Sequence, residues 1–248
     1  MRLEGKVALI TGAARGQGAA EARMFANEGA KVVLADVSDQ EGISVASEIA
    51  ESGGDAIFVH LDVTNESEWD SAVRSTVSSF GKLDILVNNA GISPKNEKGN
   101  RLDSINTDLS TWGQVFHVNF FASVILARGL QKALVKAKGT IVNVTSIAGS
   151  RVHPFAGAAY ATSKAALGAL TREMANDFGP LGVRVNAIAP GEVKTAILSK
   201  GTEKIVSDIP MKRLGMPEEV ADTIFYLCSE HASYVSGAEI EINGGQHV

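Results

Sequence analysis

The stretch KVALITGAARGQGAAEARMFANEGAKVVLAD, residues 6–36, decides the fold. It begins with a short apolar run at residues 6–10, typical of a buried strand, and continues into a glycine-rich turn at residues 11–18. A helical pattern then extends to Gly29, a residue suited to the position just after a helix end. Residues 31–36 form a second apolar strand. The stretch therefore predicts one β–turn–α–β unit of about thirty residues.

The glycines of this turn are suited to binding a phosphate. Gly12 permits a tight turn with positive φ, and Gly16 and Gly18 let backbone amides at the helix start approach a pyrophosphate. The spacing is G-x-x-x-G-x-G and differs from the common G-x-G-x-x-G fingerprint. Asp36 ends the second strand where an acid can meet an adenosine ribose 2′-hydroxyl, the alternative being a carboxylate that faces water. A 2′-phosphate would meet like charge there, and only Arg15 offers a compensating cation, so the pattern favours NAD over NADP.

Strands and helices continue to alternate to the end of the chain. Strands are expected at residues 56–61, 84–87, 138–146, 183–189 and 238–242, and helices at 40–51, 66–80, 108–136, 158–178 and 217–229. Such alternation is typical of a parallel sheet covered by helices on both faces. We therefore expect an α/β fold with a Rossmann-type, doubly wound, seven-stranded sheet in one domain, residues 1–248. Irregular segments suggest a substrate loop at about 92–107 and a lid at about 195–209.

Composition excludes several functional classes. The chain has 248 residues, 45% of them hydrophobic, and a net charge of −5 without a basic block, so nucleic acid and membrane are not expected partners. No uninterrupted apolar run reaches the roughly 18 residues of a membrane span. A single cysteine, Cys228, is expected to be a buried apolar residue and fits a reducing, cytoplasmic compartment. The five histidines lack metal-ligand spacing, so no metal is expected.

A second informative stretch is SIAGSRVHPFAGAAYATSK, residues 146–164. Ser146 follows an apolar strand, at the strand end where open α/β sheets bind ligands. Tyr160 and Lys164 stand four residues apart on an expected helix and so share one face. A nearby ammonium favours the phenolate, which makes Tyr160 a candidate proton donor and acceptor near neutral pH. The alternative is that these two residues are ordinary helix surface.

Five motifs in order identify a family resemblance. TGAARGQG at 11–18, NNAG at 88–91, Ser146, YATSK at 160–164 and PGEVKT at 190–195 together resemble the short-chain dehydrogenase/reductase family along essentially the whole chain. The resemblance implies an NAD(P)-dependent enzyme that interconverts a secondary alcohol and a ketone by hydride transfer. It also implies a homotetramer, formed through the helices at 108–136 and 158–178 and the C-terminal strand.

The resemblance implies a role for each matching residue. Tyr160 corresponds to the acid/base, Lys164 to the residue that binds the nicotinamide ribose and lowers the tyrosine pKa, Ser146 to the residue that binds the substrate oxygen, and Asn119 to the residue that holds a relay water. Asn119 is otherwise a core asparagine. The cofactor residues would be Gly12, Arg15, Gln17, Gly18, Asp36, Asp62, Val63, Asn89, Ala90, Gly91, Tyr160, Lys164, Pro190, Val193 and Thr195. The substrate residues would be Ser93, Ser146, His153, Phe155 and Tyr160, with a loop-surface imidazole as the alternative for His153.

Three departures from the family pattern make the substrate hard to transfer from any one relative. Gln17 replaces a usual Ile or Leu, the segment Arg151–Phe155 contains one extra residue, and the loop after NNAG is longer than in many members. The leading hypothesis is an NAD-linked dehydrogenase of a small or medium secondary alcohol. A second is a 3-oxoacyl-carrier-protein reductase that uses NADPH, with Arg128 and Arg172 as docking cations, although Arg172 is expected to make a surface salt bridge. A third is a non-catalytic nucleotide-sensing protein.

Overall fold

Within residues 1–195 and 201–246, which the computed structural model describes, seven parallel strands form one sheet. The strands are β1 (Val7–Thr11), β2 (Lys31–Asp36), β3 (Asp55–His60), β4 (Ile85–Asn88), β5 (Thr140–Val144), β6 (Arg184–Pro190) and β7 (Glu239–Ile242). Their order across the sheet is β3-β2-β1-β4-β5-β6-β7. The order reverses between β1 and β4, which places a ligand crevice at the carboxyl ends of these two strands. The predicted seven-stranded Rossmann-type sheet is confirmed.

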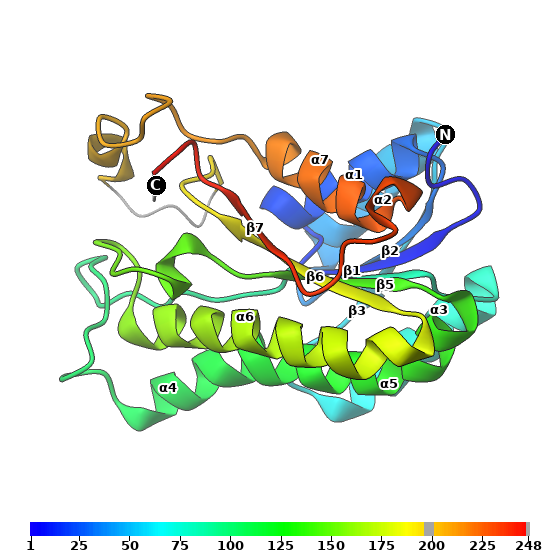
Figure 1. Cartoon of the computed structure of the whole chain (residues 1–248), viewed down its shortest axis with the longest axis horizontal. Helices are drawn as coiled ribbons and strands as arrows, with labels where there is room; N and C mark the ends of the chain where they lie inside the picture. Colours follow the sequence, from blue (N-terminus) through cyan, green and yellow to red (C-terminus); the bar gives the residue numbers. More distant parts are fainter. Residues whose placement is uncertain (196–200, 247–248) are drawn as a thin grey trace.

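Helices cover both faces of the sheet (Figure 1). The helices are α1 (Gly16–Asn27), α2 (Asp39–Glu51), α3 (Glu66–Phe80), α4 (Leu109–Phe116), α5 (Ala122–Ala137), α6 (Ala158–Phe178) and α7 (Pro217–Cys228). Helices α1, α2 and α7 lie on one face, and α3, α4, α5 and α6 lie on the other. Because both faces are covered, the central strands are apolar throughout, and all five residues of β1 are buried.

Each face has its own hydrophobic core. On the α1–α7 face, Phe25 is fully buried and its ring packs edge-on against Phe225, with centroids 6.5 Å apart. Cys228 belongs to this core and is buried, as expected. On the opposite face, Leu126, Leu130 and residues of α3 and α6 pack under the sheet. The two cores hold the strands in place, and the carboxyl ends of the strands position the residues around the crevice.

The expected helix at 108–136 is interrupted. It consists of α4, a π-helical turn at His117–Phe121, and α5. In the middle of the turn, the buried Asn119 side chain faces away from the helix toward Ile92, where its Oδ1 accepts from the amide at 2.8 Å. A π turn widens a helix locally and is often found near functional sites.

The stretch Leu109–Ala137 is long and apolar enough to cross a membrane. The sequence contains no single apolar run that indicates this, and a helix packed in the core of a globular protein meets the same criterion.

The two segments expected to border the substrate have different structures. In the loop at 92–107, Lys95 and Arg101 pair as an isolated antiparallel bridge, and the amide of Ala158 donates to the carbonyl of Leu102 at 2.9 Å. The loop therefore packs on the start of α6. Of the expected lid, residues 196–200 lie outside the described residues, and Thr202–Ile205 form a single 3-10 turn.

Candidate active site

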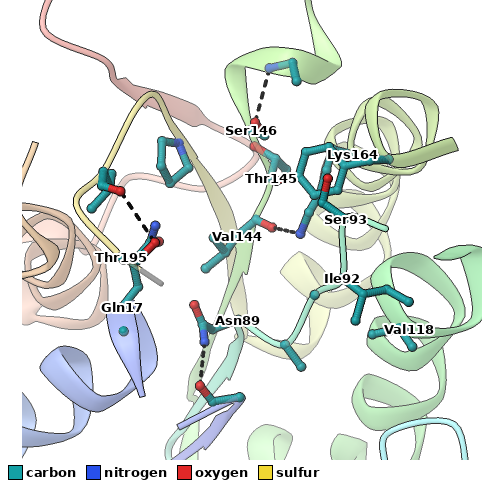
Figure 2. Close-up of a pocket in the computed structure, with 18 of the residues that line it drawn as sticks. Gln17, Asn89, Ile92, Ser93, Val118, Val144, Thr145, Ser146, Lys164 and Thr195 are labelled. Atoms are coloured by element: carbon teal, nitrogen blue, oxygen red, sulfur yellow. Dashed lines mark hydrogen bonds between the residues drawn. The ribbon is translucent and has the colours of Figure 1, made fainter. Parts of the chain in front are cut away.

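A cavity of about 620 Å³ lies across the carboxyl ends of the strands. It is bounded by the glycine-rich turn, the ends of β4 and β5, the start of α6 and the segment after β6. Figure 2 shows Gln17 and Thr195 close together on one side of it, and Ser146, Ser93 and Lys164 on the other. One continuous cavity therefore connects the glycine-rich turn, where a nucleotide could bind, with Ser146, Tyr160 and Lys164, where the reaction could take place.

The glycine turn has little room for any side chain. Gly12 has φ +67°, and a Cβ on Gly18 would lie 2.3 Å from the Gly12 carbonyl oxygen. The Asn89 side chain holds the turn from below, because its Nδ2 donates to the carbonyl of Thr11 at 2.9 Å and to that of Gly12 at 3.1 Å. Asn89 therefore stabilises the turn, and it also lines the cavity. No side chain caps the start of α1, and its first residues, Gly16 and Gln17, line the cavity, an arrangement that suits a pyrophosphate.

Asp36 is held firmly at the end of β2. Its two carboxylate oxygens accept hydrogen bonds from the amides of Ala14 and Ser38, each at 3.0 Å. It also lines the cavity, so the alternative of a carboxylate that faces only water is wrong. Arg15, which precedes α1, is exposed and borders the same end of the cavity. Asp36 and Arg15 therefore place one anion and one cation at this end of the described cavity.

Ser146, Tyr160 and Lys164 meet at the other end. Ser146 follows β5, and its Oγ accepts from the amide of Ala148 at 3.2 Å. The Lys164 ammonium is buried, donates to the carbonyl of Val144 at 2.6 Å (Figure 2) and lies 5.9 Å from the centroid of the Tyr160 ring. Tyr160 is half-buried and lines the cavity. The alternative that Tyr160 and Lys164 are ordinary helix surface is wrong.

The expected lowering of the tyrosine pKa is not found. Burial raises the pKa of Tyr160, the Ser146 hydroxyl acts in the opposite direction, and the carboxylate of Glu192 adds to the rise. Burial also lowers the pKa of Lys164 to about 8. The Lys164 ammonium donates to the Val144 carbonyl and lies 5.9 Å from the centre of the Tyr160 ring, and in this structure desolvation is the largest influence on the pKa of the phenol.

Asn119 does not line the cavity. It is buried, and besides accepting from the amide of Ile92 its Nδ2 donates to the carbonyl of Ile92 at 3.0 Å and to Ser163 Oγ at 3.1 Å. Its side chain therefore ties the segment after β4 to α6. The expected role in holding a relay water stays a prediction.

The cavity brings most of the predicted residues together. Of these, the cofactor and substrate residues that line it are Gly12, Arg15, Gln17, Asp36, Asp62, Val63, Asn89, Ala90, Gly91, Ser93, Ser146, His153, Phe155, Tyr160, Lys164, Pro190, Val193 and Thr195. Gly18 is buried beneath the turn and does not line it. The Asp62 carboxylate accepts from the amide and hydroxyl of Thr64, at 2.8 and 2.7 Å.

Two charged residues of the cavity were not assigned a role from the sequence. Lys95 and Glu192 both line the end that contains Tyr160. His153 is buried, so the loop-surface alternative is wrong, and its Nε2 lies 2.7 Å from Glu192 Oε1. Glu192 belongs to the quoted motif PGEVKT, and a carboxylate placed directly after a strand end was the available signal. In the part of the chain that the structure describes, no group of three or more His, Cys, Asp or Glu could hold a metal.

Comparisons with known proteins agree with this arrangement. The family model described as enoyl-(acyl carrier protein) reductase matches residues 12–247. Protein FixR of Bradyrhizobium diazoefficiens is 50% identical over 100% of this chain and 88% of its own length. The 2,5-dichloro-2,5-cyclohexadiene-1,4-diol dehydrogenase LinX of Sphingobium indicum is 40% identical over 100% of this chain and 98% of its own.

A solved structure is similar over the same extent. The crystal structure of a 3-oxoacyl-[acyl-carrier protein] reductase with bound NAD from Brucella melitensis has a TM-score of 0.92 and 34% sequence identity. The similarity covers 100% of this chain and 94% of that one. Both the sequence and the fold therefore match over the full extent of the site.

Proposed function

Because the chain belongs to the short-chain dehydrogenase/reductase family, we propose that it is an NAD-dependent dehydrogenase that interconverts a secondary alcohol and a ketone, with Tyr160 as acid/base. Its relatives include several dehydrogenases of hydroxyl compounds, and oxidoreduction at a hydroxyl group is the activity of the enzyme. One observation carries the proposal: Ser146, Tyr160 and Lys164 lie at one end of a cavity whose other end is the glycine turn and Asp36.

Proton transfer is assigned to the chain's own residues. Ser146 and Tyr160 bind the substrate oxygen, and Tyr160 takes the hydroxyl proton during oxidation and returns it during reduction. Lys164, whose remaining N–H groups are free of the Val144 bond, would bind the ribose hydroxyls beside the ring. When bound, the nicotinamide supplies hydride transfer, and its positive charge adds a cation that favours the phenolate.

Replacement of Tyr160 tests the chemical assignment. We expect Tyr160→Phe to reduce kcat by at least a hundredfold, because the ring remains but the proton carrier is lost. The dissociation constant for NADH, measured by fluorescence titration, should change less than threefold. A variant that retains most of its kcat would remove Tyr160 from the mechanism, and a large loss of NADH binding would indicate a structural defect instead.

The choice of NAD is argued from Asp36. A 2′-phosphate beside its carboxylate would bring like charges together at a cost of about 4 kcal/mol for each pair of unit charges ~4 Å apart at an effective dielectric of ~20. Arg15 opposes this preference, because it is exposed at the same end of the cavity. We expect kcat/KM with NAD to exceed that with NADP by at least tenfold. Steady-state titration of both cofactors against one alcohol measures this ratio, and a preference for NADP would overturn our interpretation of Asp36.

A second candidate function is reduction of a 3-oxoacyl group on a carrier protein. It is supported by the similarity to the Brucella melitensis structure, which is that of such a reductase. Arg172 is free of the expected carboxylate partner among the described residues, and its Nη1 donates to the carbonyl of Gly168 at 3.2 Å. Turnover of a 3-oxoacyl carrier protein with NADPH, faster than that of simple ketones with NADH, would favour this function over the first.

A further inference from the structure

The substrate end of the cavity contains a buried, charged pair that the general mechanism does not use. The carboxylate of Glu192 and the imidazole of His153 have side chains only 7% and 9% exposed, and their nearest atoms lie 2.7 Å apart. Both residues line the cavity that contains Ser146 and Tyr160.

The carboxylate is fixed in place but has unused hydrogen-bonding capacity. The backbone of Glu192 is held by Gly215, whose amide donates to the Glu192 carbonyl at 2.9 Å. Glu192 Oε1 is closed to solvent and faces His153 Nε2 at 2.7 Å. A carboxylate has about four lone-pair positions, and the contact with His153 takes only one of them. A ligand that brings a donor from the cavity can therefore form a further charge-assisted hydrogen bond with the Glu192 carboxylate.

The imidazole is oriented by its neighbour. The amide of Phe155 donates to His153 Nδ1 at 3.3 Å, which makes Nδ1 the acceptor and leaves the proton of a neutral ring on Nε2, the atom beside Glu192. This orientation comes from the backbone of the Arg151–Phe155 segment. The segment therefore places an imidazole against the carboxylate in the substrate end.

The positive charge of Lys95 lies in the same part of the cavity as the negative charge of Glu192. Lys95 lines the same end, and its ammonium donates to the carbonyl of Phe155. Burial lowers the pKa of Lys95, and the charge of Glu192 acts in the opposite direction, which places the two groups within electrostatic reach of each other. Glu192 is the one anion at this end of the described cavity, and Lys95 and Lys164 are both cations that line it, so the region has no excess negative charge. A neutral donor suits it better than a cation, which Lys95 would repel.

We propose that Glu192, supported by His153, is a specificity-determining residue that accepts a hydrogen bond from a second hydroxyl group of the substrate. Ser146 and Tyr160 take the oxygen that reacts, and Glu192 takes a hydroxyl elsewhere on the same molecule. The enzyme then prefers diols and polyols to alcohols with a single hydroxyl. The inference rests on the proposed function and adds a substrate class to it.

Matched substrates test the inference. We would measure kcat/KM with NAD for cyclohexanol, the cyclohexane-1,2-, 1,3- and 1,4-diols, and their mono-methyl ethers. A methyl ether keeps the second oxygen and most of the size but has no second donor. We expect the best diol to exceed its own methyl ether by at least tenfold, because a buried acceptor discriminates against a partner without the donor. Equal values for diol and ether would overturn the inference.

Variants assign the discrimination to Glu192. In Glu192→Gln, the amide group can turn a donor toward the substrate, so we expect the diol-to-ether ratio to fall at least fivefold. Glu218→Gln, on the exposed start of α7, is the matched control and should keep the wild-type ratio. An unchanged ratio in a folded Glu192→Gln protein would overturn the assignment. If that variant does not fold, the wild-type ratio still decides whether a second donor is recognised.

Two further outcomes separate the inference from its premise. If the 4-aminocyclohexanol ammonium were preferred over every diol, the neutral-hydroxyl inference would be wrong. If cyclohexanol and the diols were oxidised at similar rates, the inference would fail while the proposed function stood. If no alcohol were oxidised with NAD or NADP, and no corresponding ketone reduced, the proposed function would fail first.

Discussion

At the scale of single residues, the turn between β1 and α1 requires a residue without a Cβ atom at position 18. A Cβ on Gly18 would lie 2.3 Å from the Gly12 carbonyl oxygen and 2.6 Å from Asn89 Nδ2, and the first of these is backbone that cannot move aside. Gly16 has φ +58°, but a Cβ there would meet nothing closer than Thr195 Cγ2 at 3.6 Å. Gly18 is therefore required because there is no room for a side chain, whereas Gly16 is required only for its positive φ, although the sequence motif contains both as glycine.

This difference predicts unequal effects of the same substitution. We expect Gly18→Ala to displace the start of α1 and to weaken NADH binding by at least tenfold. Gly16→Ala should cost only about 1–2 kcal/mol of stability, the strain of a left-handed alanine. NADH titration together with urea unfolding separates the two effects. Similar NADH affinities in both variants would contradict the argument from close packing.

The positions of individual side chains were the part of the site least accessible to sequence analysis. Glycine spacing and strand ends located Asp36 and Ser146 correctly, because both follow from where an apolar run stops. The rise in the pKa of Tyr160 was not predicted, because it comes from burial, and burial depends on residues from several segments. The contact between His153 and Glu192 was not predicted for the same reason: it joins two loops that no local pattern connects.

At the scale of elements, most strands and helices were predicted to within two residues, because glycines, prolines and caps mark their ends. Asn65, for example, caps α3, because its side chain accepts from the amide of Ser67 at 3.2 Å. The π-helical turn at His117–Phe121 was missed. Asn119, in this turn, forms hydrogen bonds with Ile92, 27 positions away, and helical periodicity contains no sign of such a contact.

The packing of α1 on α7 contains a buried carboxyl group that should make stability depend on pH. Glu21 is fully buried, neither of its oxygens has a hydrogen-bond partner within the described residues, and burial raises its pKa from 4.5 to about 8. The unfolded chain releases this proton above about pH 4.5, whereas the folded chain keeps it until about pH 8. The folded state therefore binds more protons in that window, and stability falls as pH rises through it.

Replacing Glu21 with an apolar side chain should remove this dependence. We expect Glu21→Met to raise the free energy of unfolding by about 3 kcal/mol at pH 7, from 1.36 kcal/mol per unit of pKa shift, and by almost nothing at pH 4.5. Urea unfolding at several pH values measures the difference. Glu51→Met, on the exposed end of α2, controls for loss of a surface carboxylate. An equal gain at both pH values would mean that packing, not ionisation, is responsible.

At the scale of the whole molecule, the helical stretch Leu109–Ala137 leaves much of its apolar surface uncovered. Only 39% of its most apolar window is buried, and Leu109 and Phe121 are 86% and 45% exposed. An exposed apolar face on a long helix is typical of a surface that contacts another protein or a membrane. We propose that a second copy of the chain covers it, as the expected homotetramer through the helices at 108–136 and 158–178 requires.

A charged side chain on this face should therefore change the mass of the assembly. Wild-type protein is expected to have four times the chain mass of 26.0 kDa by light scattering after size exclusion. Phe121→Arg should shift it to a smaller species, because an unpaired guanidinium buried between helices is strongly unfavourable. Val77→Arg is the matched control: Val77 is similarly exposed, at 42%, but lies on α3 outside the proposed interface, so its mass should not change. A monomeric wild type would exclude the tetramer, and an unchanged mass for Phe121→Arg would place the interface elsewhere.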